Sequence, residues 1–164
     1  MIRTGIGYDC HRFAAGRRLV LGGVELSSEL GLEGHSDADV LTHAIIDALL
    51  GAAALGDIGR HFPDTDPRYA GADSIALLRE VGAMLGARGW TVGNVDATVV
   101  IEEPKLAPFV ERMCASLTDA LGLPSGRISV KATRGEGMGF VGRGEGAAAL
   151  AVATVTSGQE IAGR

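Results

Sequence analysis

Apolar residues recur at intervals of three and four between residues 40 and 52, where they form the clearest periodic pattern in the chain. Its members are Val40, Leu41, Ala44, Ile45, Ala48, Leu49 and Ala52. This spacing predicts one buried face of an α-helix. Ser36 or Asp37 can cap the start of the helix, and Gly56 can end it. We expect this helix to lie at the centre of the fold.

Helical spacing recurs in two further segments. Residues 73–88 predict a second helix, whose start Asp73 or Ser74 can cap. Residues 106–121 predict a third helix, which Gly122 can terminate.

Other segments alternate between apolar and polar residues or are rich in valine and threonine, which favours β-strands. They are residues 2–9, 91–101, 127–133 and 145–156, together with 17–26, a strand or hairpin arm with a kink at Gly22-Gly23. Glycine-rich loops are predicted at residues 56–67 and 134–144. Residues 158–164 are expected to form a frayed C-terminal tail.

The order of these elements is strand, strand, helix, helix, strand, helix, strand, strand. It predicts an α+β fold in which helices pack on one face of a mixed β-sheet. We expect residues 1–157 to form a single catalytic domain. Small residues in the last strand are suited to close packing against another sheet, such as that of a second subunit.

Composition narrows the range of partners. The chain has 164 residues, 46% of them hydrophobic, and a net charge of -5 without a long basic run, so nucleic acid is not an expected partner. The two cysteines are too few for a disulfide framework. No apolar run is long enough to cross a membrane, and no signal-peptide pattern is present, so we expect a cytoplasmic protein.

Asp9, His11 and His43 are the sharpest candidate site. Asp9 and His11 are two residues apart on a strand and therefore project from the same face. Two imidazoles and one carboxylate suit zinc, and three protein ligands leave a fourth position open, as in catalytic zinc sites. The alternative to a metal site is that these three polar residues cap secondary structure or form hydrogen bonds within the core. Asp39 and Asp47 lie one helical turn from His43, and either could orient its ring.

Acidic residues in two loops allow two interpretations. Asp57, Asp64 and Asp66 could bind magnesium or take part in a phosphate-linked site. Asp-rich loops with proline and glycine, however, are usually solvated turns. Glu102 and Glu103 are expected to form a solvated strand edge.

Basic residues near the C-terminal loop are equally ambiguous. Lys131, Arg134 and Arg143, with glycines between them, could cradle phosphates or form a turn with exposed charges. His35 precedes the central helix, where backbone N–H groups favour anions. Cys10 has no assigned role.

Several long blocks, in order, resemble the 2-C-methyl-D-erythritol 2,4-cyclodiphosphate synthase family of the non-mevalonate isoprenoid pathway. The resemblance spans nearly the whole chain. It rests on GYDCHRF at 7–13, GHSDADVLTHAIIDALLGAAALGDIG at 34–59, HFPDTDP at 61–67, GNVDATV at 93–99, PKLAP at 104–108, KAT at 131–133 and GFVGRGEG at 139–146.

The resemblance implies conversion of 4-diphosphocytidyl-2-C-methyl-D-erythritol 2-phosphate to 2-C-methyl-D-erythritol 2,4-cyclodiphosphate with release of CMP. It implies one Zn²⁺ per subunit at Asp9, His11 and His43. A second divalent cation, Mg²⁺ or Mn²⁺, would be bound with substrate and Glu136. The alternatives are a non-catalytic trimer that binds nucleotides or isoprenoid diphosphates, and a zinc phosphohydrolase.

The family also implies a homotrimer of ferredoxin-like or chorismate-mutase-like subunits, with active sites at the subunit interfaces. His35 would stabilise the transition state, with Ser36 beside it. Residues matching the methylerythritol pocket are Asp57, Ile58, Gly59, Phe62, Pro63, Asp64, Thr65 and Asp66. Residues matching the cytidine and diphosphate cradle of a neighbouring subunit are Pro104, Lys105, Leu106, Ala132 and Thr133. Phe140 and Arg143 match positions near the trimer axis, where relatives can hold an acidic lipid-like ligand.

Two positions depart from the family pattern. Arg134 stands where the family usually has a phosphate-binding threonine, so no role is carried over to Arg134. Ala38 replaces a glycine common in the family, which is a mild change.

Overall fold

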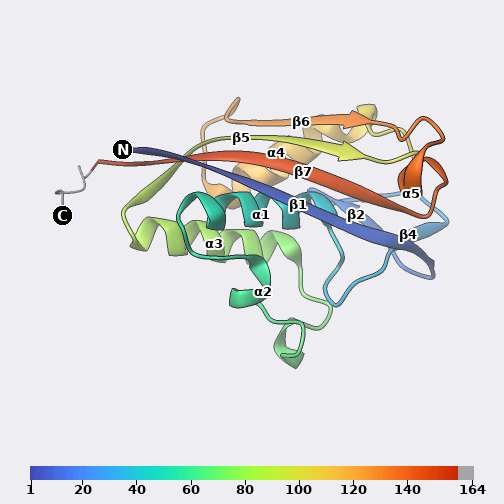
Figure 1. The fold of residues 1–164 in the computed structure, drawn as a ribbon, viewed down its shortest axis with the longest axis horizontal. Helices are drawn as coiled ribbons and strands as arrows, with labels where there is room; N and C mark the ends of the chain where they lie inside the picture. Colours follow the sequence, from blue (N-terminus) through green and yellow to red (C-terminus); the bar gives the residue numbers. More distant parts are fainter. Residues whose placement is uncertain (159–164) are drawn as a thin grey trace.

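The computed structural model describes residues 1–158. Its central element is a mixed β-sheet of five strands (Figure 1). The strands are β1 (Ile2–Ala15), β4 (Leu30–Leu32), β5 (Trp90–Val100), β6 (Ile128–Thr133) and β7 (Gly146–Ser157), in the order β4-β1-β7-β5-β6. Only β5 and β6 are parallel. The predicted α+β fold with a mixed sheet is therefore confirmed. Of the predicted tail, residues 159–164 lie outside the described part.

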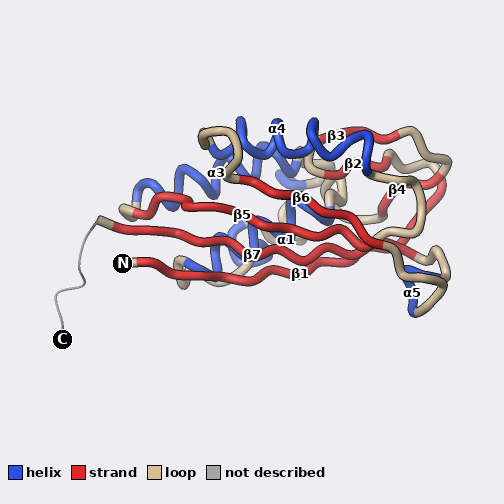
Figure 2. The backbone as a smooth tube through the Cα atoms, turned by 90° about the horizontal axis from the view of Figure 1, so that it is seen from above, coloured by secondary structure: helices blue, strands red, loops and turns tan. Residues whose placement is uncertain are grey.

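Three long helices lie on one side of this sheet (Figure 2). They are α1 (Val40–Ala52), α3 (Ser74–Ala87) and α4 (Val110–Leu121). The shorter elements are α2 (Ile58–His61), η1 (Pro67–Tyr69), η2 (Ala107–Phe109) and α5 (Gly139–Gly142), together with the hairpin β2 (Leu19–Leu21) and β3 (Val24–Leu26). Among the described helices, none is both long and apolar enough to cross a membrane.

Several predicted boundaries were wrong. β1 continues to Ala15 instead of ending at residue 9, because its whole length pairs with β7 and β4. The segment 17–26 is a separate two-stranded hairpin that turns at Gly22 and Gly23. β4 was not predicted, since three residues are too few to show a period. The third helix begins as the 3₁₀ turn η2, and the predicted loop 134–144 contains α5.

Asp39, rather than Ser36 or Asp37, caps α1. Its carboxylate accepts hydrogen bonds from the backbone N–H groups of Thr42 and, outside the helix, of Gly22 and Gly23. The buried Asp39 therefore fastens the start of α1 to the turn of the β2–β3 hairpin.

The other end of α1 also differs from the prediction, which placed a terminator at Gly56. The helix ends at Ala52, and Ala54 adopts the left-handed conformation that turns the chain away. Gly56 lies beyond this turn. A residue with a side chain therefore makes the turn that was assigned to glycine.

Small residues bring the centre of the sheet close to α1. A Cβ built on Gly5 would lie 2.0 Å from the carbonyl oxygen of Ala48, so only glycine fits there. On β7, the helix-facing side chains are buried alanines: Ala147, Ala149, Ala151 and Ala153. The helix-facing small residues of the last strand thus pack inside this chain, and packing of this strand against the sheet of another subunit remains a prediction.

The opposite side of the sheet, called the open face below, is covered by none of the three long helices (Figure 2). Ile6 and Tyr8 of β1 lie directly opposite Val152 and Leu150 of β7, and these side chains are 70%, 52%, 42% and 41% exposed. An apolar patch therefore stands where the two central strands meet.

Candidate metal centre

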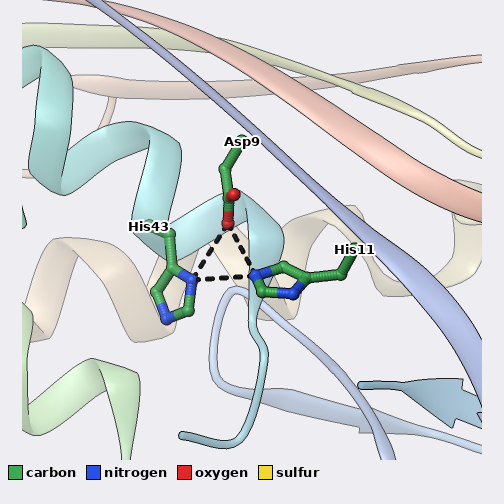
Figure 3. Close-up of side chains that lie close together, drawn as sticks. All are labelled: Asp9, His11 and His43. Carbon is green, nitrogen blue, oxygen red and sulfur yellow. Dashed lines mark hydrogen bonds and ion pairs between the residues drawn. The ribbon is translucent and has the colours of Figure 1, made fainter. Parts of the chain in front are cut away.

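The side chains of Asp9, His11 and His43 converge on one point (Figure 3). Asp9 Oδ2 lies 2.9 Å from His11 Nε2 and 3.0 Å from His43 Nδ1, and the two imidazole nitrogens are 3.3 Å apart. The potential ligand atoms all lie within 4.8 Å of one another. The cluster predicted from the sequence is therefore assembled by the fold.

Two elements bring these residues together. Asp9 and His11 project from the helix-facing side of β1, whereas Cys10 between them is exposed on the open face. His43 faces them from the first turns of α1. Because β1 lies close against α1, residues that are 32 apart in the sequence become neighbours.

Hydrogen bonds orient both imidazole rings. His11 Nδ1 lies 2.7 Å from the carbonyl oxygen of Glu33, an acceptor, so Nδ1 carries a proton and Nε2 faces the cluster. His43 Nε2 lies 3.2 Å from Ser36 Oγ and 2.9 Å from Ser74 Oγ. These contacts leave His43 Nδ1 directed at Asp9.

The prediction that Asp39 or Asp47 orients the ring of His43 was wrong. Asp39 is occupied by its own cap and by the β2–β3 turn, and Asp47 accepts a hydrogen bond from the backbone N–H of Ile58 at 2.7 Å. The two serines occupy the ring nitrogen that those carboxylates would have met.

Charge and burial act in opposite directions in this cluster. Burial alone would raise the pKa of Asp9, but hydrogen bonds from His11 and His43 outweigh it and hold the pKa well below its usual range. Burial alone would lower the pKa of His11, but the hydrogen bond and charge of Asp9 raise it. The metal-free cluster therefore favours an ionised carboxylate beside a protonated imidazole.

The donor set fits a borderline divalent metal such as zinc. Zinc–ligand bonds of about 2.0–2.1 Å in a tetrahedral arrangement separate the ligand atoms by about 3.3 Å. The separations of 2.9, 3.0 and 3.3 Å are close to this value, so an ion can replace the proton with small side-chain movements. Three ligands leave a position free for a substrate oxygen.

A cavity of about 220 Å³ opens beside the cluster. Predicted site residues His35, Ser36, Ile58 and Phe62 line it together with the three cluster residues. The lining also contains Asp47, Tyr69 and Leu77, which were not predicted as site residues. Leu77 lies in the second predicted helix, and Tyr69 lies two residues after the HFPDTDP block.

The remaining loop residues border this region without lining the cavity. Asp57 caps α2 by accepting a hydrogen bond from Arg60 N, and Asp66 caps η1 and pairs with Arg68 at 2.7 Å. Asp64 is exposed. Asp57 and Asp66 thus have a structural role as helix caps. The predicted roles in substrate binding remain predictions for Asp57, Gly59, Pro63, Asp64, Thr65 and Asp66.

The predicted cytidine and diphosphate residues lie elsewhere in the chain. Strand register places Ala132 of β6 level with Asp9 of β1, with β7 and β5 between them. Three strand spacings of about 4.8 Å separate them by about 14 Å. Pro104 lines a different cavity, of about 520 Å³, together with Arg143. One chain therefore does not bring this group to the metal cluster.

The basic residues that could have cradled a phosphate are each paired with a different carboxylate. Lys131 contacts Asp96 at 2.5 Å, Arg134 contacts Glu103 at 3.0 Å, and Arg143 contacts Glu145 at 2.6 Å. Within one chain, this favours the interpretation as exposed charges.

Glu102 is more than the solvated edge that was expected. It accepts hydrogen bonds from the backbone N–H groups of Gly135 at 2.8 Å and Gly137 at 3.4 Å. These contacts hold the loop on both sides of Glu136, the predicted ligand of a second cation.

The fold and the cluster define an α+β protein with a carboxylate–imidazole site whose three ligand atoms are close enough together to hold one metal ion. The chain belongs to the YgbB family, whose model matches residues 2–156. The family resemblance inferred from the sequence is thereby confirmed.

Named relatives fall into two groups. A 2-C-methyl-D-erythritol 2,4-cyclodiphosphate synthase of Alkaliphilus metalliredigens is 56% identical and covers 94% of this chain and 97% of the relative. A bifunctional enzyme IspD/IspF of Anaeromyxobacter dehalogenans is 63% identical over 93% of this chain, which spans only 39% of that relative. A solved 2C-methyl-D-erythritol-2,4-cyclodiphosphate synthase in its CDP-bound form has a TM-score of 0.86 at 38% identity, over 94% of this chain and 100% of that one.

Proposed function

We propose that this chain converts 4-diphosphocytidyl-2-C-methyl-D-erythritol 2-phosphate to 2-C-methyl-D-erythritol 2,4-cyclodiphosphate and CMP. The single observation that carries the proposal is the convergence of Asp9, His11 and His43 beside a cavity lined by His35 and Ser36. Membership of the YgbB family and the names of its relatives support it. Residues 1–157 would form the catalytic domain, and the cytoplasmic location remains a prediction.

The reaction is an intramolecular phosphoryl transfer. An oxygen of the 2-phosphate forms a bond to the β-phosphorus, and the bond from that phosphorus to the bridging oxygen breaks. CMP leaves with the α-phosphate and the electron pair of the broken bond. The protein supplies no nucleophile, so its task is to hold two anionic groups together and to offset their repulsion.

Asp9, His11 and His43 would hold Zn²⁺, and Glu136 would help to hold a second cation, Mg²⁺ or Mn²⁺. Bound metal supplies positive charge that polarises a phosphoryl oxygen. His35 is exposed at the mouth of the cavity. Its Nε2 has a long, weak contact of 3.4 Å with the carbonyl oxygen of Asp66. Its ring is therefore available to donate a hydrogen bond to phosphate in the transition state.

The cytidine and diphosphate contacts would come from a neighbouring subunit. Ala132 lies about 14 Å from Asp9 within one chain, which is too far for both to contact one phosphate. The proposed cradle of Pro104, Lys105, Leu106, Ala132 and Thr133 would reach the cavity of an adjacent copy. A homotrimer of ferredoxin-like or chorismate-mutase-like subunits, with three interfacial sites, meets this requirement.

The open face supports assembly. Ile6, Tyr8, Leu150 and Val152 expose an apolar patch that water disfavours, and burial against other copies would remove it from solvent. Phe140 and Arg143 border open cavities of about 660 and 520 Å³ beside β1. We expect these two residues to lie near the trimer axis.

Arg134 favours a second candidate, a trimer that binds its nucleotide without turnover. Its guanidinium is paired with Glu103 instead of offering the hydroxyl found in the family. A zinc phosphohydrolase is the third candidate. Purified, zinc-loaded protein incubated with the substrate and followed by phosphorus NMR separates the three. Cyclic diphosphate with equimolar CMP supports the cyclase, binding without CMP supports the second candidate, and an open-chain product supports the third.

A further inference from the structure

We infer that Ser74 and Asp37 are positioning residues that hold His43 in the tautomer required for metal binding, an inference that rests on the proposed metal site. Both lie outside the set of Asp9, His11 and His43. They act on the far side of the His43 ring, away from the cluster.

Ser74 is the first residue of α3 and its side chain is fully buried, with 0% exposure. Its Oγ lies 2.9 Å from His43 Nε2. Asp37 in turn contacts Ser74 twice: Oδ2 accepts the backbone N–H at 3.0 Å, and Oδ1 accepts the hydroxyl in a short hydrogen bond. A carboxylate, a hydroxyl and an imidazole are therefore connected in sequence.

The direction of each proton follows from the acceptor at the end of this chain. An ionised carboxylate only accepts, so the single hydroxyl proton of Ser74 is directed to Asp37. What Ser74 presents to His43 is then a lone pair, and His43 Nε2 must donate. When a metal ion is bound, His43 Nδ1, the nitrogen that faces the cluster, is consequently the one that carries no proton.

Ser36 cannot impose this direction by itself. Its Oγ lies 3.2 Å from His43 Nε2 and accepts a hydrogen bond from Ala38 N at 3.2 Å, which leaves its own proton free to point either way. Only the contact through Ser74 ends on a carboxylate. The tautomer is therefore decided by Asp37, which does not touch the ring.

The segments that carry the pair are fastened to each other by backbone hydrogen bonds. Gly71 N donates to His35 O at 2.8 Å, and Asp37 N donates to Ala72 O at 3.1 Å. The loop before α1 and the start of α3 thus form one support for the His43 ring.

Asp37→Asn gives the sharpest test because it preserves size. An asparagine whose carbonyl accepts Ser74 N–H places its NH₂ group against Ser74 Oγ, which frees the hydroxyl proton to donate to His43 Nε2. Ser74→Ala removes the acceptor. The matched control is Asp73→Ala, which removes the side-chain cap of α3 at Ile75 N without touching Ser74 Oγ.

Two measurements apply to the wild type, the three single variants and the Asp37→Asn/Ser74→Ala double variant: zinc affinity by chelator competition, and ¹⁵N NMR of His43 Nε2–H in the zinc-loaded protein. We expect Asp37→Asn and Ser74→Ala to lose about 10–100-fold in zinc affinity and to change the ¹⁵N chemical shift of His43 Nε2–H, which loses its hydrogen-bond acceptor. The double variant should lose little more than Ser74→Ala alone. Asp73→Ala should keep both properties.

A wild-type zinc affinity together with a wild-type Nε2–H shift in Asp37→Asn would overturn the inference, and so would an equal loss of zinc affinity in Asp73→Ala. If Ser74→Ala does not fold, Asp37→Asn still decides. Wild-type protein measured in parallel keeps the outcomes distinct: absence of zinc binding or CMP release there counts against the proposed function, whereas normal wild-type behaviour with unchanged variants counts against this inference alone.

Discussion

Gly7 of β1 lies directly against the backbone of Ala44 in α1, where a Cβ built on Gly7 would fall 2.0 Å from the Ala44 carbonyl oxygen. This contact sets the distance between the strand that carries Asp9 and His11 and the helix that carries His43. The metal cluster therefore depends on a position that has no functional group.

We expect Gly7→Ala to destabilise the protein by about 1–3 kcal/mol or more, because the strand must move away from the helix. Zinc affinity should fall as well. Gly51→Ala is the control: it lies in α1, and its added Cβ would have only Ile6 O nearby, at 3.9 Å. Urea denaturation and zinc titration of both variants check this; a fully stable Gly7→Ala protein would contradict the close packing.

His43→Ala should lose zinc binding and turnover together. Loss of a ligand removes the charge that polarises the phosphoryl oxygen, worth several kcal/mol, so kcat should fall about a thousandfold or more. His61→Ala should retain both, since His61 Nε2 contacts the carbonyl oxygen of Leu55 instead of the cluster. Metal analysis and CMP release measure the two effects. An active His43→Ala enzyme would refute the ligand assignment.

Acidification should weaken zinc binding from a pH above the ordinary histidine pKa of about 6.5, because the pKa of the metal-free His11 is raised and its proton competes with zinc. Zinc titrations between about pH 5 and 8, around the ordinary histidine pKa of about 6.5, check this. Affinity that does not change across this window would contradict it.

The metal-free protein should show the opposite trend. A raised pKa of His11 contributes stability that is fully present below about pH 6.5 and is lost as the pH rises through the raised value. The lowered pKa of Asp9 contributes stability above about pH 3.9 that is lost as the pH falls. Wild type should therefore exceed His11→Ala most between about pH 4 and 6.5, as measured by urea denaturation with a chelator present.

Lys105→Ala should weaken substrate binding more than it slows the reaction, because Lys105 is proposed to contact the nucleotide end and not the reacting phosphorus. Loss of one charge-assisted hydrogen bond, about 1.5–3 kcal/mol, should raise KM by about 10–100-fold. Lys105→Arg keeps the charge and should lose less. Steady-state kinetics with the three proteins give the comparison, and a large fall in kcat with unchanged KM would count against this role.

Val152→Glu should separate the subunits while leaving the metal cluster intact. A charge in the apolar patch opposes its burial, so native mass should fall from about three times the 16.8 kDa chain to one. CMP release should be lost and zinc binding kept, because the three ligands belong to one chain. Ala115→Glu, exposed on α4 on the other side of the sheet, should remain trimeric. A monomeric wild type would refute the proposed assembly.

Local sequence patterns predicted the orientation of the residues that form the metal cluster. A period of two placed Asp9 and His11 on one face of a strand, and a period of three to four placed His43 on a buried helix. The resemblance then joined them into one site. Short-range periodicity was sufficient here because each residue's orientation depends only on its own strand or helix.

The hydrogen bonds that support the cluster could not be predicted from local periodicity. The sequence spacing suggested Asp39 and Asp47 as partners of His43, yet Ser74, 31 residues away, holds the ring, and Asp39 instead fastens the β2–β3 turn. Three-residue β4 had no period to detect. Such contacts depend on how loops fold over one another, which no local pattern encodes.

By itself, the sequence determined the α+β class, the positions of the main helices and strands, and the identity of the three clustered ligands. Only the tertiary structure decided that Asp9 and Ala132 lie three strands apart in one sheet. It also decided that Asp37 is linked to His43 through Ser74. The physical reason is that side-chain direction is set within an element, whereas distances between elements are set by strand register and by the close packing of glycine and alanine against α1.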